Sequence, residues 1–369
     1  MTAIRSGFSP LVYHSDYEVP EEEEAQTREN LMTTLRGISE KTCTGSGHAT
    51  RSVHAKSHGL LLGELQVLDG LPPYLAQGIF AKAANFPVVM RISTIPGDIL
   101  DDNVSTPRGF AIKLVGVEGE RLMGTESAVT QDFVLVNGPA FLTPGPRQFL
   151  SKLKLLAVTT DKAPALKKAL STVLQGTEKL IEAVGGESAT IKTIGGHPET
   201  HVLGETYFSQ VPIMYGDYMA KISIAPVSDS LLQLKNAPVD LNDKPNGLRE
   251  AVVDFFASNT AQWELRVQLC TDLQAMPIED ASVVWPEELS PYIAVARITA
   301  KPQQAWSEER SKIVDDGMSF SPWHGIEAHR PIGSIMRVRK LAYEMSAKFR
   351  AEHNRVSMVE PASLDHFPD

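Results

Sequence analysis

The pattern of apolar and polar positions predicts first an irregular arm and then a helix. The start of the chain carries two prolines and the acidic run Glu21–Glu24, so we expect no regular structure there. Apolar residues then recur at helical spacing, with Thr27 or Arg28 to Leu35 as the predicted body of the helix. Residues 1–40 are therefore predicted to form an N-terminal arm and helix.

From about residue 59 the apolar positions alternate with polar ones, which predicts short β-strands. Each segment is bounded or closely flanked by Gly, Pro, Asp or Asn, as is typical of strands joined by turns. The predicted strands are Leu60–Leu68, Pro87–Ile95, Phe110–Val117, Phe133–Asn137, Thr206–Ile213, Tyr218–Pro226, Trp263–Cys270 and Tyr292–Thr299. Eight short strands predict an antiparallel sheet closed into a barrel, because closure removes exposed edges. The predicted class is α+β, with the barrel over residues 41–302.

Apolar residues at three- and four-residue spacing predict further helices. Residues 147–184 are predicted to form a helical insertion between strands, and a shorter helix lies near Gly247–Ser258. Residues 303–369 begin with a loop rich in Trp, Pro and Gly and end in a helix from about Ile332 to His353. Pro331 is expected in the first turn of that helix, where its missing N–H leaves no bond unmade. We predict one domain overall.

Composition and charge argue against several classes of protein. The 42% of apolar and 22% of charged residues are near the averages for globular proteins. A net charge of −10 argues against nucleic acid as a partner, because that partner needs a basic face. No segment reaches the roughly 20 apolar residues needed to cross a bilayer, and we predict no signal peptide. The two cysteines, Cys43 and Cys270, can build neither a disulfide framework nor a cysteine metal site, which fits a reducing cytoplasm.

Arg339 and Tyr343 lie one turn apart in the last predicted helix. At about 100° per residue, Arg339, Tyr343 and Arg350 fall within an arc of roughly 40° on one face. A guanidinium beside a phenol favours the phenolate, the form that binds iron, although the reference pKa of tyrosine is about 10. The alternative is a surface helix whose tyrosine caps the core while its arginines face water.

Two other arginines, Arg51 and Arg91, suggest a binding site for an anion. Arg51 stands three residues before His54, and Arg91 and Ser93 point to the same side of a predicted strand, which could be the barrel interior. A buried arginine needs an anion such as a carboxylate or phosphate of a ligand. Structural salt bridges are the alternative, and the candidate partners are Asp98, Asp101 and Asp102.

His54 and His58 stand four residues apart, a spacing that could place two metal ligands on one helical face. The glycine that follows His58, the missing glutamate beside His54 and the lack of a third ligand nearby argue against a zinc site. The other histidines are scattered, so we treat them as ordinary polar residues.

Read together, these segments resemble the catalases, and the similarity covers most of the chain. The resemblance is carried by RSVHAKSHG (51–59), RISTI (91–95), PRGFAIKL (107–114), DFVLVNGPAF (132–141), MPIEDASVVWPEE (276–288), FSPWHGIE (320–327) and RVRKLAY (337–343). Each motif alone is a weak signal. Seven in the order of the family, joined by the count of eight strands, favour ligand-binding roles for Tyr343, His54, Arg51 and Arg91 over the structural alternatives.

The resemblance implies a haem b held between the barrel and the C-terminal helix. Tyrosine is the axial iron ligand in catalases, and Tyr343 matches that position. The other implied roles are a hydrogen bond from Arg339 to Tyr343; propionate binding by Arg51, Arg91 and Arg350; a distal His54 bonded to Ser93; Val53 packed on the porphyrin; and Phe149 stacked near the distal ring.

The implied function is a haem peroxidase with catalase activity toward hydrogen peroxide. His54 would move a proton from the inner to the outer peroxide oxygen, so that water leaves and a ferryl species remains. A second peroxide would close a catalase cycle, and an organic electron donor would close a peroxidase cycle. Two rivals stay open, namely rearrangement of fatty acid hydroperoxides, as in the related allene oxide synthases, and non-catalytic haem binding or storage.

The chain departs from the family in four places. It is shorter than a full catalase and has no counterpart of the NADPH-binding surface, so we predict no nicotinamide. Val136 occupies the position of the distal asparagine, and Asn137, one place along, can act only if a bulge turns it to the other face. The access-channel aspartate is here Thr106, which argues against fast disproportionation.

Two further expectations follow from the resemblance. Val53 stands where the allene oxide synthases typically have threonine, which favours hydrogen peroxide over a lipid hydroperoxide. The N-terminal arm resembles the wrapping arms of the family, so we expect a homodimer or homotetramer.

Overall fold

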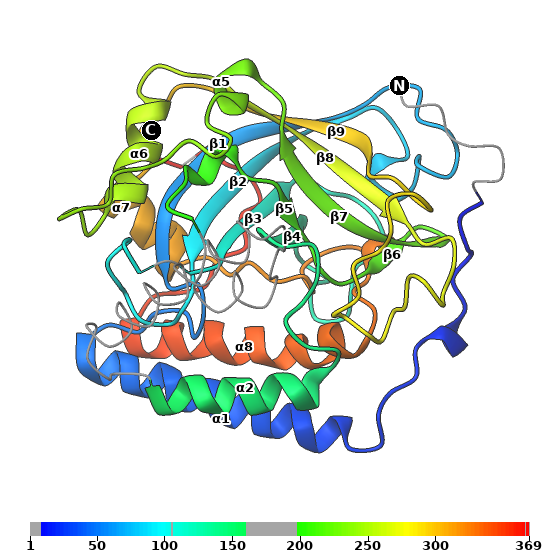
Figure 1. Cartoon of the computed structure of the whole chain (residues 1–369), viewed down its shortest axis with the longest axis horizontal. Coiled ribbons are helices and arrows are strands. Elements are labelled where there is room, and N and C mark those ends of the chain that lie inside the picture. The colour runs from blue at the N-terminus through cyan, green and yellow to red at the C-terminus, as the bar shows by residue number, and fades with distance from the viewer. Residues whose placement is uncertain (1–8, 105, 160–197, 366, 369) are drawn as a thin grey trace, which may run out of the picture.

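The structure is a computed structural model that describes residues 9–104, 106–159, 198–365 and 367–368. A rolled β-sheet lies above a layer of three helices (Figure 1). The strands are β1 (Lys56–Val67), β2 (Asn85–Thr94), β3 (Arg108–Val115), β4 (Thr130–Val136), β5 (Tyr207–Phe208), β6 (Ile213–Tyr215), β7 (Tyr218–Pro226), β8 (Ala261–Leu269) and β9 (Ile293–Ala300). The α-helices are α1 (Glu24–Ser46), α2 (Pro146–Thr159), α5 (Asp229–Leu232), α6 (Gly247–Phe256), α7 (Glu308–Ser311) and α8 (Ser334–Asn354). Short 3-10 turns lie at Ser15–Tyr17, Gly78–Phe80, Val202–Gly204 and Glu327–His329, and a π-helical turn lies at Lys312–Asp316.

Eight of these strands form a closed antiparallel ring in the order β1, β2, β3, β4, β5, β7, β8, β9 and back to β1. The ring is closed by β5, which pairs Phe208 with Val136 of β4 and Tyr207 with Ile224 of β7. β6 adds a ninth strand, because it pairs with the other end of the same edge of β7. The predicted class, α+β with an eight-stranded antiparallel barrel, is confirmed.

One predicted strand, Thr206–Ile213, is divided in the structure into β5 and β6. Gln210, between them, has a backbone φ of 64°, which extended strands do not adopt. Pro212 has no N–H to donate to a neighbouring strand. These two residues break the ladder in a segment whose composition otherwise favours a strand.

The first helix is longer than predicted, because α1 runs to Ser46 and so beyond residue 40. Gly37 and several threonines in its middle weaken the helical signal in the sequence. Packing sustains the helix instead, since Leu31, Leu35 and Ile38 are all buried on one side. Gly47 ends α1 in the left-handed conformation, with a φ of 72°.

The predicted helices near the insertion and at the end of the chain are also found. α2 begins the predicted insertion, and residues 160–184 of that prediction lie outside the described residues. The prediction that Pro331 lies in the first turn of the last helix is wrong. Gly333, with a φ of 86°, turns the chain before α8 begins, and Pro331 forms a β-bridge with Ile213 instead.

The strands β2, β3 and β4 have two different faces. On β2, Met90 and Ile92 belong to the apolar cluster that fills the barrel, so the residues between them, Arg91 and Ser93, face outward. The interpretation that Arg91 and Ser93 point into the barrel is therefore wrong. The outer face looks toward the layer of α1, α2 and α8 (Figure 1), whose own core includes Leu31, Leu35, Leu150, Leu153 and Val338.

Candidate functional site

A cavity of about 110 Å³ lies between the outer face of the barrel and the helices α1 and α8. Its lining comes from segments that are far apart in the sequence: Leu35, Arg51, Ser52, Val53, His54, Arg91, Ser93, Gly109, Phe110, Ala111, Val134, Leu135, Ser319, Phe320, Ala342, Tyr343, Ser346 and Arg350. Seven of the ten predicted site residues are among them: Arg51, Val53, His54, Arg91, Ser93, Tyr343 and Arg350. The fold therefore gathers most of the predicted site in one place.

His54 lies in the bend between α1 and β1, with a backbone φ of 55° that is uncommon for a residue with a side chain. Its imidazole packs directly on Gly109, because a Cβ at that position would lie 2.7 Å from Nδ1. The same nitrogen is 3.3 Å from Oγ of Ser93. Burial, and then the charges of nearby arginines with Arg91 first, lower the pKa of His54 to about 3. The ring is thus neutral above about pH 4 and can accept a proton.

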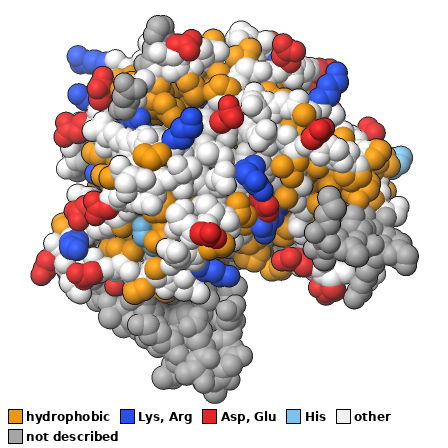
Figure 2. Space-filling model, turned by 90° about the horizontal axis from the view of Figure 1, so that it is seen from above, with side chains coloured by type: hydrophobic (Ala, Val, Ile, Leu, Met, Phe, Trp, Pro, Cys, Tyr) orange, Lys and Arg blue, Asp and Glu red, His pale blue; other side chains and the backbone are white. Residues whose placement is uncertain are grey.

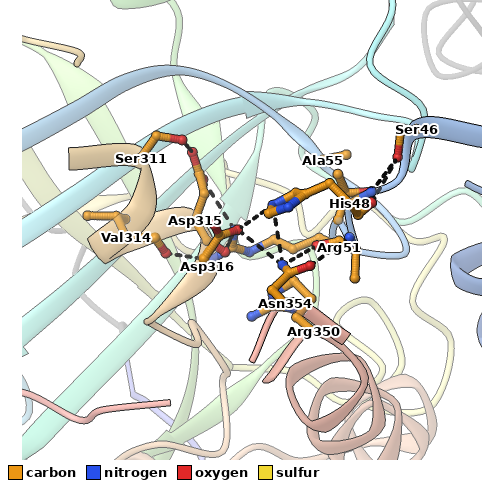
Figure 3. Close-up of polar contacts among 12 residues, drawn as sticks. Ser46, His48, Arg51, Ala55, Ser311, Val314, Asp315, Asp316, Arg350 and Asn354 are labelled. Atoms are coloured by element: carbon orange, nitrogen blue, oxygen red, sulfur yellow. Dashed lines mark hydrogen bonds and ion pairs between the residues drawn. The ribbon is translucent and has the colours of Figure 1, made fainter. Parts of the chain in front are cut away.

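Three guanidinium groups line the cavity: those of Arg91 and Arg350 are buried and that of Arg51 is partly buried, and Figure 3 labels Arg51 and Arg350. Nε of Arg91 donates to Oδ1 of Asp315 at 2.7 Å, and Nη1 of Arg51 lies 3.2 Å from the same oxygen. Arg51 also donates to backbone carbonyl oxygens of the π-helical turn and the residues after it. Nη2 of Arg350 donates to the carbonyl oxygen of Met318 at 3.1 Å. We call Arg51, Arg91, Arg350 and Asp315 the pocket cluster.

The pocket cluster holds three cations and one carboxylate. Asp316, the next acid along the chain, is engaged elsewhere, with Oδ1 2.9 Å from Nε2 of His48 (Figure 3). Burial and the charge of Arg91 lower the pKa of Arg350 to about 10. For Asp315, the charges of Arg91 and Arg51 outweigh burial and lower its pKa to about 2. Nε of Arg350 is buried without a hydrogen-bond partner, so the cluster can accept a further anion.

Tyr343 lines the cavity from α8, on the side opposite the strands. No hydrogen bond to its hydroxyl group is found among the residues that the structure describes. Arg339, one turn earlier, is not in the lining of the cavity. Its guanidinium lies 5.3 Å from the centroid of the Phe141 ring, a cation–π contact, and the described residues show no hydrogen bond from it to Tyr343.

Comparison with known proteins identifies this architecture. No protein-family model and no curated protein sequence matches the chain. A fungal catalase structure matches it with a TM-score of 0.60 and 17% identity, over 99% of this chain and 75% of the other. Catalase A from Saccharomyces cerevisiae matches with a TM-score of 0.60 and 16% identity, over 94% and 68%, and a bacterial catalase with 0.57 and 15%, over 96% and 68%. The fold is that of the catalases. The predicted resemblance is confirmed at this level.

Within this catalase fold, Asn137 lies away from the cavity. Its Oδ1 accepts from the backbone N–H of Arg108 at 2.9 Å, and its Nδ2 donates to Glu205 at 2.6 Å. β3 and β4 pair in continuous register up to Gly109 and Val136, so this stretch has no bulge that would turn Asn137 around. On β3 and β4 the cavity is lined by small and apolar residues, among them Gly109, Ala111 and Val134.

Phe149 and Thr106 also have other partners. Phe149 on α2 packs against Phe141 with ring centroids 5.0 Å apart, between the barrel and the helical layer. The hydroxyl of Thr106 donates to the backbone oxygen of Ile95 at 2.6 Å, so it serves as a link between two chain segments.

Asp315 is the site residue that the sequence did not reveal. The salt bridges considered for the arginines exist, but Arg51 and Arg91 form them with Asp315, and Asp102 pairs with Lys56 at 2.7 Å. The hydroxyls of Ser57 and Ser311 hold the other carboxylate oxygen of Asp315 at 2.7 and 2.8 Å. A π-helical turn positions it, and such a turn is too short to leave a period in the sequence.

Elsewhere, the part of the chain that the structure describes contains no group of three or more His, Cys, Asp or Glu arranged to hold a metal ion. None of its helices has the length and apolar character needed to cross a membrane. His58 is buried in β1, with Nε2 2.9 Å from Oγ1 of Thr94. On the face drawn in Figure 2, acidic and basic side chains are scattered among one another.

Proposed function

We propose that this chain binds haem b in the cavity and uses it to react with peroxide. The observation that carries the proposal is the meeting, in the lining of one cavity, of a phenol from α8, a neutral imidazole and three guanidinium groups. The catalase fold supports it, because solved structures with this fold include catalases from a fungus, a yeast and a bacterium.

The side chains that line the cavity fit such a group chemically. Tyr343 offers an oxygen ligand for iron. The excess positive charge of the pocket cluster suits two propionates, and the unpartnered Nε of Arg350 would gain a partner. Because a macrocycle is one ring thick, it needs a slot between two walls, and the strands and α8 form those walls. Val53 and the apolar wall formed with Val134 would contact its faces.

When bound, haem iron supplies the redox chemistry that the protein side chains lack. The chain supplies a proton carrier, His54. If its Nδ1–H donates to Ser93, Nε2 has a free lone pair and can accept a proton from peroxide. Burial and the nearby arginine charges lower the pKa of His54 and so make its protonated form a strong acid, which readily returns the proton to the leaving oxygen.

Hydrogen peroxide is the substrate in this proposal, with a second peroxide or an organic electron donor completing the cycle. One observation favours a second candidate, rearrangement of a fatty acid hydroperoxide. Asn137 faces away, and Gly109, Ala111 and Val134 form an apolar wall that would suit an alkyl chain.

Titration of the purified chain with haem tests the proposal. We expect a Soret band, peroxide turnover, and loss of both in Tyr343→Phe. Tyr218→Phe, on β7 and outside the lining of the cavity, is the matched control and should keep both. A wild-type chain that develops no Soret band overturns the proposal. Rapid loss of the conjugated diene of a fatty acid hydroperoxide, without an electron donor, would favour the second candidate.

A further inference from the structure

An open groove of about 480 Å³ runs between α1 and α8 on the outside of the helical layer. It shares no lining residue with the cavity described above. Binding pockets typically have volumes of roughly 300–1,000 Å³, and this groove lies within that range, so it is large enough to bind a partner.

The floor of the groove is apolar and ordered along α8. Leu341, Met345 and Phe349 are spaced by four residues and so form one ridge of the helix. Met32 of α1 faces this ridge across the groove. Leu341, Met345 and Met32 are half-exposed, and the two methionines can adapt their shape to an incoming surface.

The rim of the groove is charged, and its charges alternate. Glu344, Lys348 and Glu352 form the neighbouring ridge of α8 at the same four-residue spacing. Lys348 is 78% exposed and Glu352 57% exposed, with 3.9 Å between their charged atoms. Arg36 on α1 is 60% exposed and completes a set of two cations and two anions. The rim is therefore neutral as a whole.

We propose that this groove is the docking surface for a second copy of the chain, with α8 packed against α8. A two-fold contact requires a patch that is complementary to itself. A two-fold axis near residue 346 places Glu344 of each copy opposite Lys348 of the other. A partner of uniform charge would instead meet like charge at half of the rim, which disfavours a basic or an acidic protein.

The ridges of α8 also fit this arrangement. Two helices whose four-residue ridges interlock cross at about −50°, the commonest packing class of globular proteins. The apolar ridge of each copy would then enter the furrow between the apolar and charged ridges of the other. This inference is independent of haem binding.

The association state of the full chain tests the inference by sedimentation velocity over a range of micromolar concentrations. We expect a dimer for the wild type and a monomer for Met345→Glu and Leu341→Glu. Leu232→Glu on α5 is the matched control, because Leu232 is 46% exposed and lies outside the groove, and it should stay dimeric. Far-ultraviolet circular dichroism checks that each variant is folded. A monomeric wild type, or a Met345→Glu variant that stays dimeric, overturns the proposal.

Charge reversal tests the two-fold register. Glu344→Lys and Lys348→Glu should each raise the dimer dissociation constant roughly 10- to 100-fold, because each places like charges opposite one another. The double variant should return to near the wild-type constant, since the opposite charges face each other again. A double variant that remains as weak as the single ones overturns the register.

Discussion

A second buried cluster of charge lies on the same outer face of β3 and β4 as the cavity. Its strand residues, Lys113 and Asp132, are each two positions from the cavity residues Ala111 and Val134. We call it the tail cluster, and its members are Lys113, Asp132, His324 and Glu360. Nζ of Lys113 lies 2.7 and 2.9 Å from the oxygens of Asp132 and 2.6 Å from Glu360. Nδ1 of His324 lies 3.2 Å from both carboxylates. Two cations thus meet two anions, and each has a partner.

The pocket cluster differs in balance, because it has three guanidinium groups and one carboxylate. That carboxylate pairs with Arg51 and Arg91, and Nε of Arg350 has no hydrogen-bond partner. Buried charges are tolerated when they are fully paired. Through Glu360 the tail cluster links the C-terminal tail to the barrel, and Asp132 accepts a hydrogen bond from the backbone N–H of Ser321 in a neighbouring loop. Buried charge left in excess costs stability unless a ligand compensates it. The comparison separates a cluster whose charges are all paired from a cluster whose excess positive charge can accept a further anion.

Removal of the imidazole should have the largest effect and should leave the fold intact. His54→Ala is expected to lower peroxide turnover roughly 10²- to 10⁴-fold, the usual contribution of a general acid–base group. Haem affinity should stay close to that of the wild type, because Tyr343, the proposed iron ligand, and the arginines of the pocket cluster remain. Stopped-flow peroxide consumption and the Soret titration measure the two quantities, with His14→Ala as a remote control. Unchanged turnover in His54→Ala would rule out its role as the proton carrier.

Loss of one cation from each cluster should affect stability very differently. Lys113→Met leaves the fully buried Asp132 short of a partner and should lower the free energy of unfolding by roughly 3–5 kcal/mol. Arg350→Met removes a cation that is already in excess and should change it by about 1 kcal/mol or less, while weakening haem binding. Urea unfolding of the haem-free variants gives both values. Equal losses would show that the two clusters do not differ in balance.

The tail cluster should also make stability depend on pH on the alkaline side. Burial opposes the charged form of His324, but hydrogen bonds with Asp132 and Glu360 outweigh it and raise its pKa to about 9. Its stabilising contribution is full below the unfolded pKa of about 6.5 and is lost as pH rises through about 9, up to about 3 kcal/mol. Urea unfolding across this range should show the decline, and His324→Gln should flatten it. A wild-type profile parallel to that of His324→Gln would contradict the assignment.

Crowding of His54 should affect turnover less than removal of its imidazole. The Cβ of Gly109→Ala would lie 2.7 Å from Nδ1 of His54 and 2.9 Å from Oγ of Ser93, so the ring must move. If His54 is the proton carrier of the proposed function, its displacement should lower turnover roughly 10- to 100-fold. Gly138→Ala is the matched control, since its Cβ would meet only Gln210 at 3.7 Å. Turnover that falls equally in both variants would indicate a general effect on the sheet.

The barrel could be predicted from the sequence because alternation marks strands locally. Six of the residues that line the cavity could be predicted because they lie in recognisable motifs, and Arg350 because it falls on the same helical face as Tyr343. The remaining residues depend on distances that the sequence does not show. Asn137 lies one residue after Val136 in a strand pairing without a bulge, so it does not reach the cavity. The guanidinium of Arg339 lies over the ring of Phe141, which is far from it in the sequence. Asp315 reaches Arg91 from 224 residues away. Tertiary packing decides such contacts, and no local period records them.

The closed ring of strands has one narrow junction, at β5, which we call the seam. β5 contributes two residues, and a single residue pair, Val136 with Phe208, joins it to β4, whereas the other junctions outside β5 have four or more pairs. Thermal breathing should therefore start at this seam, and the amide hydrogens around Phe208 should exchange with solvent earlier than those of β2 and β3. If β5 separates, β4 and β7 would each expose an unpaired strand edge to other chains. The smallest strand of the barrel ring therefore also protects the protein against aggregation.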